Sequence, residues 1–207
     1  MSAARSGRLM TSADLEPILR TNPWVAALLD RFDTIALPDC WIVAGALVQT
    51  VWNHRFGMPP TTGIADIDIV YFDPDLSAEA ETAHAERLRL AFADLPVWLD
   101  VKNQARVHLW YEARFGVALA PYPSTAAAIA TYPTTATATG VRMATRQFET
   151  CAPFGLDDLF AGVVRPNRVL VTEDVYAAIA SRWAAIWPVT VHPWNDPACV
   201  AAHKVGN

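Results

Sequence analysis

Two aspartates, Asp66 and Asp68, stand two residues apart at the head of the apolar run GIADIDIVYFD. Side chains alternate between the two faces of a β-strand, so this spacing points both carboxylates to the same side. Neighbouring carboxylates repel each other, and each costs free energy where the strand begins to bury. A divalent cation would relieve that cost, because Mg²⁺ prefers carboxylate oxygens. The spacing therefore favours a metal site at the start of this strand.

Two other features extend this prediction. Asp100 lies in a second apolar segment, VWLDVKN, where a carboxylate is out of place unless it has a use. Gly45 and Ala46 stand between a short strand, 41–44, and a helix, where small residues let a phosphate approach backbone N–H groups. Carboxylates on neighbouring strands can hold one or two Mg²⁺ (or Mn²⁺) ions that bridge phosphate oxygens, while a third acts as a base.

Other interpretations of these residues stay open. A DxD pair also occurs at a solvated strand end, and Gly45 also fits a plain tight turn. Haloacid-dehalogenase-type phosphatases carry DxD at the end of a strand, whereas here the apolar run IVYF follows the aspartates and disfavours that class. Glycosyltransferases use DxD too, but no other feature of the sequence supports one. Lys102, Arg106 and His108 follow Asp100 and can meet phosphates, or they are ordinary surface residues.

The helices and strands that must position these residues alternate along the chain, but not regularly. Helices are expected over 13–20, 23–32, 45–54, 77–94, 124–131, 155–165 and 172–187, and strands over 41–44, 66–73, 97–103 and 137–143. Residues 104–116 form a helix or a loop. The Pro-, Thr- and Ala-rich stretch 121–143 also fits a low-complexity linker, but its apolar density does not fall. The fold class is α/β (α+β), a small mixed sheet flanked by helices.

Composition limits the class of protein further. The 207 residues indicate a single domain, with a core over about 38–190 and loosely ordered tails at 1–12 and 196–207. The formal net charge of −5 gives no strong nucleic-acid signal and disfavours anionic membranes. No apolar stretch is long enough to span a bilayer, and no secretory signal is seen. Three widely spaced cysteines indicate reduced thiols and a cytoplasmic location. The tryptophans fit core positions, among them Trp52, Trp98, Trp110, Trp183 and Trp187.

The run VAGALVQTVWNHRFGMPPTTGIADIDIVYFD resembles the nucleotidyltransferase superfamily of the DNA polymerase β type. The shared pattern is a Gly-Gly or Gly-Ser turn into a helix, then a strand of alternating hydrophobic and Asp residues. The arrangement is most similar to the tRNA-CCA-adding and poly(A) polymerase version. Together with DVKNQARVHLWY, APFGLDDLF and RPN, it resembles an uncharacterised bacterial nucleotidyltransferase-like family over about 41–190.

This resemblance implies Mg²⁺-dependent (or Mn²⁺-dependent) transfer of a nucleoside monophosphate from an NTP donor to a hydroxyl acceptor, with release of pyrophosphate. The acceptor is a small molecule, a protein or an RNA end. The implied site comprises Asp66, Asp68 and Asp100 as catalytic and metal residues, and Gly45, Ala46, Gln49 and Lys102 as nucleotide- or phosphate-binding residues.

Two departures from the pattern bear on activity. Ala46 lacks the hydroxyl that Ser would offer to a phosphate, and Gln49 stands where CCA-adding enzymes carry Arg. No tRNA-binding extension is visible in the sequence. Two other functions therefore stay open: a catalytically inactive nucleotide- or metal-binding module, and a non-catalytic interaction protein on the same fold.

Overall fold

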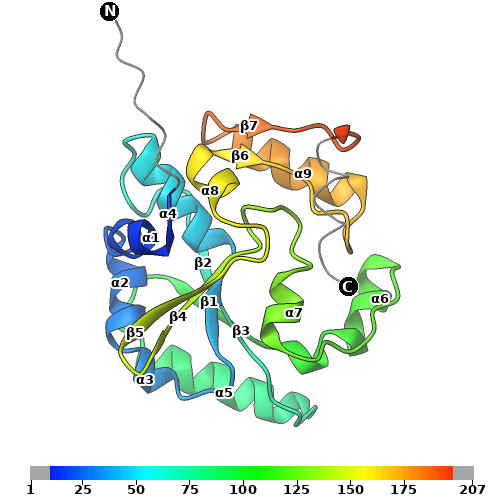
Figure 1. The fold of residues 1–207 in the computed structure, drawn as a ribbon. Helices are drawn as coiled ribbons and strands as arrows, with labels where there is room; N and C mark the ends of the chain where they lie inside the picture. Colours follow the sequence, from blue (N-terminus) through cyan, green and yellow to red (C-terminus); the bar gives the residue numbers. More distant parts are fainter. Residues whose placement is uncertain (1–9, 198–207) are drawn as a thin grey trace, which may run out of the picture.

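The computed structural model describes residues 10–197, and its centre is a five-stranded sheet in the order β3-β2-β1-β4-β5 (Figure 1). The strands are β1 Trp41–Val43, β2 Asp66–Tyr71, β3 Trp98–Asn103, β4 Gly140–Ala144 and β5 Gln147–Cys151. β2 and β3 run parallel, whereas the β1–β2, β1–β4 and β4–β5 pairs are antiparallel. The predicted small mixed sheet is therefore confirmed.

Helices surround this sheet. They are α1 Ser12–Leu19, α2 Pro23–Asp30, α3 Phe32–Ile35, α4 Gly45–Arg55, α5 Ala78–Ala91, α6 His108–Phe115, α7 Thr125–Ile129, α8 Asp157–Ala161 and α9 Glu173–Ala184, with a 3₁₀ turn, η1, at Gln104–Arg106. Side-chain caps begin several of them: Asn22 before α2, Ser77 before α5, Ser124 before α7 and Thr172 before α9. None of the helices within residues 10–197 is both long enough and apolar enough to cross a membrane.

The two faces of the sheet have different roles. Ile67 and Ile69 of β2 and Val101 of β3 are buried in the main core with side chains of α4 and α5. The opposite face carries Val70 in a smaller cluster with Ile129 of α7. Since side chains alternate along β2, that second face is also the one on which Asp66 and Asp68 lie.

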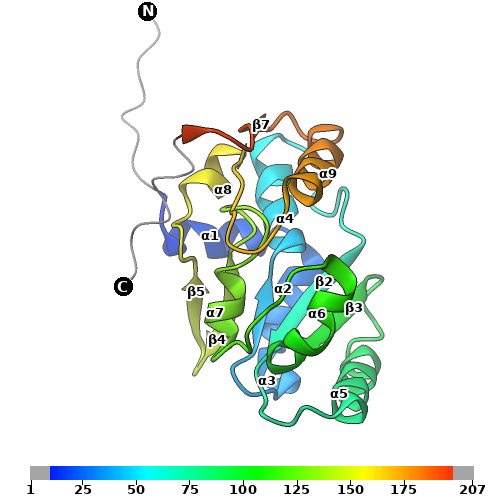
Figure 2. The same ribbon diagram turned by 90° about the vertical axis from the view of Figure 1, so that its right-hand side faces the viewer.

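The C-terminal elements gather at one end of the molecule (Figures 1 and 2). There a second, two-stranded parallel sheet pairs β6 Val163–Val164 with β7 Thr190–Val191. Trp52 of α4 packs edge-to-face against Trp183 and Trp187, with ring centroids 5.2 and 5.8 Å apart. The indole N–H of Trp187 donates to Asn53 Oδ1 at 2.7 Å. These buried contacts fix α9 against α4 and confirm the predicted core role of the three tryptophans.

Trp98 corrects one prediction, because its side chain is 56% exposed instead of buried. It lies at the start of the edge strand β3, and the Arg89 guanidinium stacks over its ring at 3.8 Å. An edge strand has a neighbour on one side alone, so apolar residues at its end are covered less.

The threonine-rich segment before β4 corrects a second prediction. The predicted strand 137–143 begins only at Gly140, since Thr134 and Thr137 instead form a buried turn held by their own hydroxyl groups. Threonine hydroxyls compete with ladder hydrogen bonds in this way. The segment is folded, with α7 inside it, so the linker interpretation is wrong. The short elements α3, β5, β6 and β7 were not predicted.

Of the predicted loosely ordered tails, residues 1–9 and 198–207 lie outside the described residues, whereas residue 12 already begins α1. Cys199 is outside as well. Cys40 and Cys151 are free thiols, as predicted.

Candidate active site

The carboxylates come together through strand register. Asp68 of β2 stands directly opposite Asp100 of β3 in the parallel pair, and Asp66 stands opposite Trp98. Residues in register on parallel strands share a face, so all three carboxylates lie on the same side of the sheet. The Lys102 ammonium, two residues further along β3, is 3.4 Å from Asp100 Oδ1. The predicted juxtaposition of the three acids on neighbouring strands is therefore present.

Their mutual repulsion is visible at Asp68. Burial raises the pKa of its carboxyl to about 7 from the ordinary value of 3.8, and the charges of Asp66 and Asp100 push it further in the same direction. Lys102 opposes this shift by stabilising the ionised form. A positive charge near Asp68 is therefore favourable.

The N-terminus of α4 opens beside these acids. Val43, the last residue of β1, pairs with Asp68, and α4 begins two residues later at Gly45. The first N–H groups of an α-helix have no partner within the helix and attract anions. A Cβ built on Gly45 would meet no atom within 4 Å, and its backbone φ is not positive. Neither packing nor backbone conformation of the described residues therefore requires glycine here, which leaves room for a ligand.

The residue between strand and helix, Ala44, has an unusual backbone. Its φ is 58° and its ψ −126°, a backbone conformation that residues other than glycine rarely adopt. The Ala44 N–H donates to the Thr139 carbonyl at 3.0 Å, so the neighbouring strand connection holds this turn in place. Ala44 also lines the cavity described below. Strained residues of this kind cluster at functional sites.

This conformation makes glycine and valine behave oppositely at position 44. We expect Ala44→Gly to leave the free energy of unfolding unchanged or raised by up to ~1 kcal/mol, because strain is relieved. Ala44→Val should lower it by about 2 kcal/mol or more. Urea unfolding measures both. Ala83→Gly, at an exposed position inside α5, is the control and should cost about 1 kcal/mol. An equal loss for Ala44→Gly and Ala83→Gly would contradict the strain.

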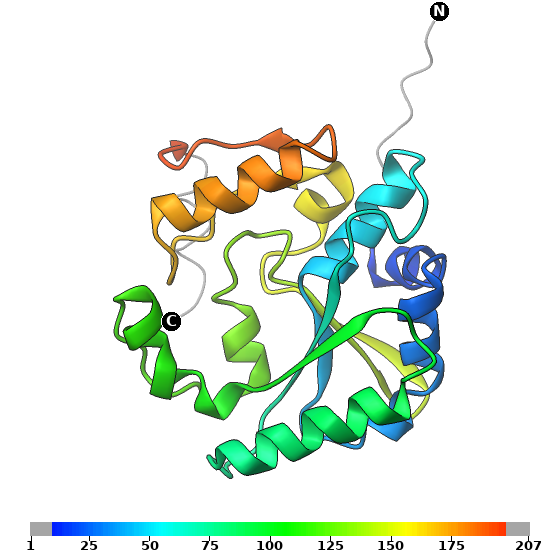
Figure 3. The ribbon, with the colours of Figure 1, turned by 180° about the vertical axis from the view of Figure 1, so that it is seen from behind.

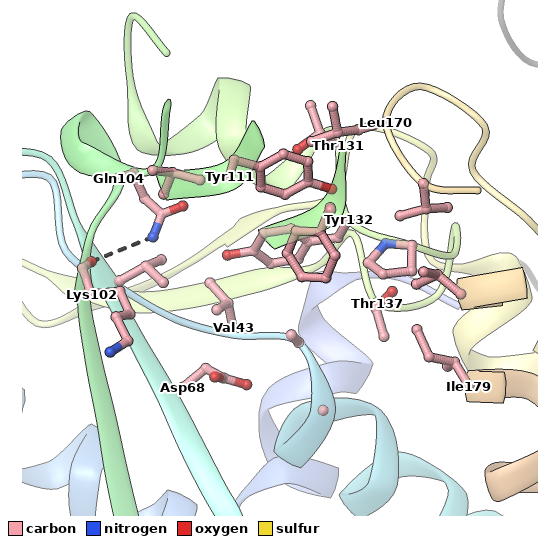
Figure 4. A pocket seen from close by; sticks show the side chains of 18 of the residues that line it. Val43, Asp68, Lys102, Gln104, Tyr111, Thr131, Tyr132, Thr137, Leu170 and Ile179 are labelled. Atoms are coloured by element: carbon pink, nitrogen blue, oxygen red, sulfur yellow. Dashed lines mark hydrogen bonds between the residues drawn. The ribbon is translucent and has the colours of Figure 1, made fainter. Parts of the chain in front are cut away.

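A cavity of about 480 Å³ extends from the acids and the start of α4 (Figure 4). This volume is in the range of small-molecule sites. Its floor is the second face of the sheet. One wall comes from α6, the segment that connects it to α7, and residues 131–137 after α7, and the other wall comes from α9 and the residues just before it. In Figure 3, α6 and α9 lie on the same side of the molecule. Segments far apart in the sequence therefore build it.

Most of the predicted site residues line this cavity: Gly45, Gln49, Asp66, Asp68 and Lys102. Asp100 adjoins it through Lys102. The side chain of Ala46 is 1% exposed and packs in the main core, so Ala46 can meet a ligand through its backbone alone.

Arg106, Arg165 and Arg168 do not line the cavity. Arg106 pairs with Glu81 at 2.5 Å, and Arg165 forms a two-pronged ion pair with Asp158, at 2.8 and 3.2 Å. Arg168 donates to the Trp194 carbonyl. These are structural contacts.

Sequence reasoning missed several residues of the cavity. They are Gln104, Tyr111, Tyr122, Tyr132 and Arg182, together with Ala44. Arg182 makes no hydrogen bond or ion pair with any described residue. Gln104 was detectable, since it continues the alternation of Asp100 and Lys102 on the same face. Tyr111 and Arg182 belong to the helices α6 and α9, whereas Tyr122 and Tyr132 lie in the segments on either side of α7. No local pattern reveals how these parts of the chain pack together.

The donor set fits a hard divalent cation bound together with a phosphate group. Within residues 10–197, no three His, Cys, Asp or Glu side chains approach closely enough to form a ligand set by themselves. Mg²⁺ usually binds through one or two carboxylates plus waters and substrate phosphates. Asp66 and Asp68 supply such a pair beside a helix N-terminus that suits phosphate. The pair therefore suits a cation that arrives with a phosphate group.

A helix N-terminus next to paired aspartates on a small mixed sheet, with a further acid on the parallel neighbour, defines a nucleotidyltransferase-type domain. The family model described as Nucleotidyltransferase matches residues 30–191, and the chain belongs to this family. A protein whose NMR structure "reveals a CCA-adding enzyme head domain" is similar, with a TM-score of 0.72 and 26% identity over 90% of this chain and 100% of that one. No curated protein matches the chain significantly.

Proposed function

We propose that the protein transfers a nucleoside monophosphate from an NTP to a hydroxyl acceptor in a reaction that depends on Mg²⁺ or Mn²⁺. Family membership supports nucleotidyl transfer. The observation that carries the finer proposal is the alignment of Asp66, Asp68 and Asp100 on one face, beside the open N-terminus of α4. Carboxylate oxygens, which suit a divalent cation, and helix N-terminal N–H groups, which suit a phosphate, would then act together at one end of one cavity.

Each residue then has a role in the transfer. Asp66 and Asp68 would hold the metal ion, which supplies Lewis-acid activation and charge neutralisation when bound. The first turn of α4 at Gly45 would bind the β- and γ-phosphates, with Gln49 and Lys102 beside it. The acceptor oxygen attacks the α-phosphorus, and the bond to the β-phosphate oxygen breaks. Pyrophosphate leaves, and Asp100 takes the proton of the acceptor hydroxyl.

The cavity favours some acceptors over others. Among the described side chains that line it, Lys102 and Arg182 are the cationic ones. A site for a long polynucleotide uses many basic contacts to phosphates. A small molecule, a protein side chain or an RNA end would need fewer, so these remain the proposed acceptors and a long nucleic acid is the least favoured.

Thermal unfolding with each of the four NTPs, in Mg²⁺, Mn²⁺ or EDTA, tests the proposal. A ligand at 100 times its Kd stabilises the folded state by about 2.7 kcal/mol. We expect stabilisation that requires the metal, followed by pyrophosphate release once an acceptor is supplied. Binding without any release would favour the inactive nucleotide-binding module. No stabilisation by any nucleotide, in folded protein, would refute the proposed function and favour an interaction protein.

Arg182 gives a prediction about the phosphates. Arg182 is an exposed residue of α9 that lines the cavity, and its guanidinium has no partner among the described residues. We expect Arg182→Gln to weaken binding of metal–NTP by about 5- to 20-fold, in line with the loss of a charge-assisted hydrogen bond. Added salt should reduce the difference from wild type. Arg146→Gln, at the exposed β4–β5 turn, is the control. Equal affinities for wild type and Arg182→Gln would exclude the contact.

A further inference from the structure

Gln104 is a buried amide that the proposed chemistry leaves unused. Its side chain is 5% exposed, and it follows directly after β3. A buried amide costs free energy unless its donors and acceptor are hydrogen-bonded. The Gln104 side chain has one hydrogen bond to a described residue, from Nε2 to the Lys102 carbonyl at a long 3.4 Å. Figure 4 shows its amide oxygen on the other side, pointing toward Tyr111.

The space that Gln104 faces is bounded by aromatic rings. Trp110, Tyr111 and Phe115 of α6 line it, together with Tyr122 and Tyr132. The Tyr122 hydroxyl is bonded to Thr131 at 2.6 Å, whereas the Tyr132 hydroxyl has no partner among the described residues. Tyr132 projects into the cavity between Gln104 and Asp68 (Figure 4). We call this part of the cavity the aromatic recess. It joins flat aromatic walls to polar groups that have no hydrogen-bond partner among the described residues, which suits a planar ligand with a hydrogen-bonding edge.

The aromatic recess is one nucleotide unit away from the acids. Gln104 follows Asp100 by four residues on the same side of the chain, a separation of roughly 13 Å at the rise of a β-strand. Asp100 is opposite Asp68, where the α-phosphate would lie. The sugar of a bound nucleotide would bridge this interval, and its base would then reach Gln104.

We infer that the aromatic recess binds the nucleobase of the NTP and that Gln104 is the residue that selects among bases. The inference rests on the proposed function. A glutamine amide offers one acceptor and two donors, the pattern by which amides read base edges. Stacking on aromatic side chains tolerates every base, whereas hydrogen bonds discriminate between them.

Equilibrium binding in Mg²⁺ to the four NTPs and to inorganic tripolyphosphate, which lacks a base, tests the inference. We expect wild type to bind the preferred NTP at least tenfold more tightly than the NTP that it binds most weakly. Gln104→Leu should bring the four NTP affinities to within about threefold of each other, and Gln104→Glu should change their order. Tripolyphosphate affinity should stay unchanged in both variants. Gln104→Glu also keeps the test valid if the leucine variant does not fold.

The outcomes separate the inference from the function. If the NTPs bind but their ranking is the same in wild type and in a folded Gln104 variant, the base-selecting role is overturned while the nucleotide site stands. If tripolyphosphate affinity falls together with NTP affinity, Gln104 acts on the phosphates and the inference also fails. If neither NTP nor tripolyphosphate binds wild type, the proposed function itself fails.

Discussion

Asp68→Asn is expected to raise the free energy of unfolding by about 2–4 kcal/mol above pH 7. The pKa of Asp68 is about 7 in the folded protein and near 3.8 in an exposed chain, chiefly because burial disfavours the charge. Each unit of difference between the folded and unfolded pKa values corresponds to about 1.4 kcal/mol of stability. Removing the charge removes this cost, so the variant gains stability although it loses a functional group.

The sign follows from proton binding. Between about pH 4 and pH 7 the folded protein keeps a proton on Asp68 that the unfolded chain has released. Wild-type stability therefore loses this contribution as pH rises through that range, and the full cost is present above pH 7. The difference between Asp68→Asn and wild type should be small near pH 4, grow up to about pH 7 and then level off.

Urea unfolding of both proteins from pH 4 to pH 8 measures this difference. Asp174→Asn, at an exposed position in the first turn of α9, is the matched control. It should lower stability slightly, because a carboxylate there interacts favourably with the helix dipole. A constant difference between Asp68→Asn and wild type across this pH range would show that the Asp68 charge carries no folding cost.

The same substitution should abolish function. Asp68 is one of the two carboxylates proposed to hold the metal ion, so we expect metal–NTP affinity to fall at least 100-fold. The stabilised variant rules out unfolding as the cause. Retained, EDTA-sensitive NTP binding in Asp68→Asn would remove Asp68 from the metal site.

Gly45→Ala is expected to reduce binding of metal–NTP and of tripolyphosphate at least tenfold without any loss of stability. The new methyl group would meet no protein atom within 4 Å, and alanine is the better helix former. It would occupy the space through which a phosphate reaches the first N–H groups of α4. Calorimetric titration measures the affinity, and thermal unfolding measures the stability.

The neighbouring residue provides the control for Gly45. Ala46→Gly removes a methyl group that is buried in the main core, so it should lower stability by about 1–2 kcal/mol. Its phosphate affinity should stay within a fewfold of wild type. Stability and affinity would then change independently at adjacent positions. Unchanged affinity in Gly45→Ala would mean that phosphates do not approach the start of α4.

Much of the site was predictable because it depends on short-range rules. Alternation along a strand puts Asp66 and Asp68 on one face, and the same rule extends from Asp100 to Lys102. The strand-to-helix junction at Gly45 follows from an apolar run that meets a helical pattern. Capping residues such as Ser77 and Thr172 similarly mark helix starts. Each of these features involves residues only a few positions apart.

Tertiary structure decided the rest. The register that sets Asp68 opposite Asp100 depends on pairing between strands separated by α5. The positive φ of Ala44 is held by a hydrogen bond to Thr139, far along the chain. Gln104 and Arg182 face one cavity because helices from different parts of the sequence pack around it. The amino-acid sequence by itself determined which groups could do chemistry. Long-range packing, which no local pattern encodes, determined which of them meet and what surrounds them.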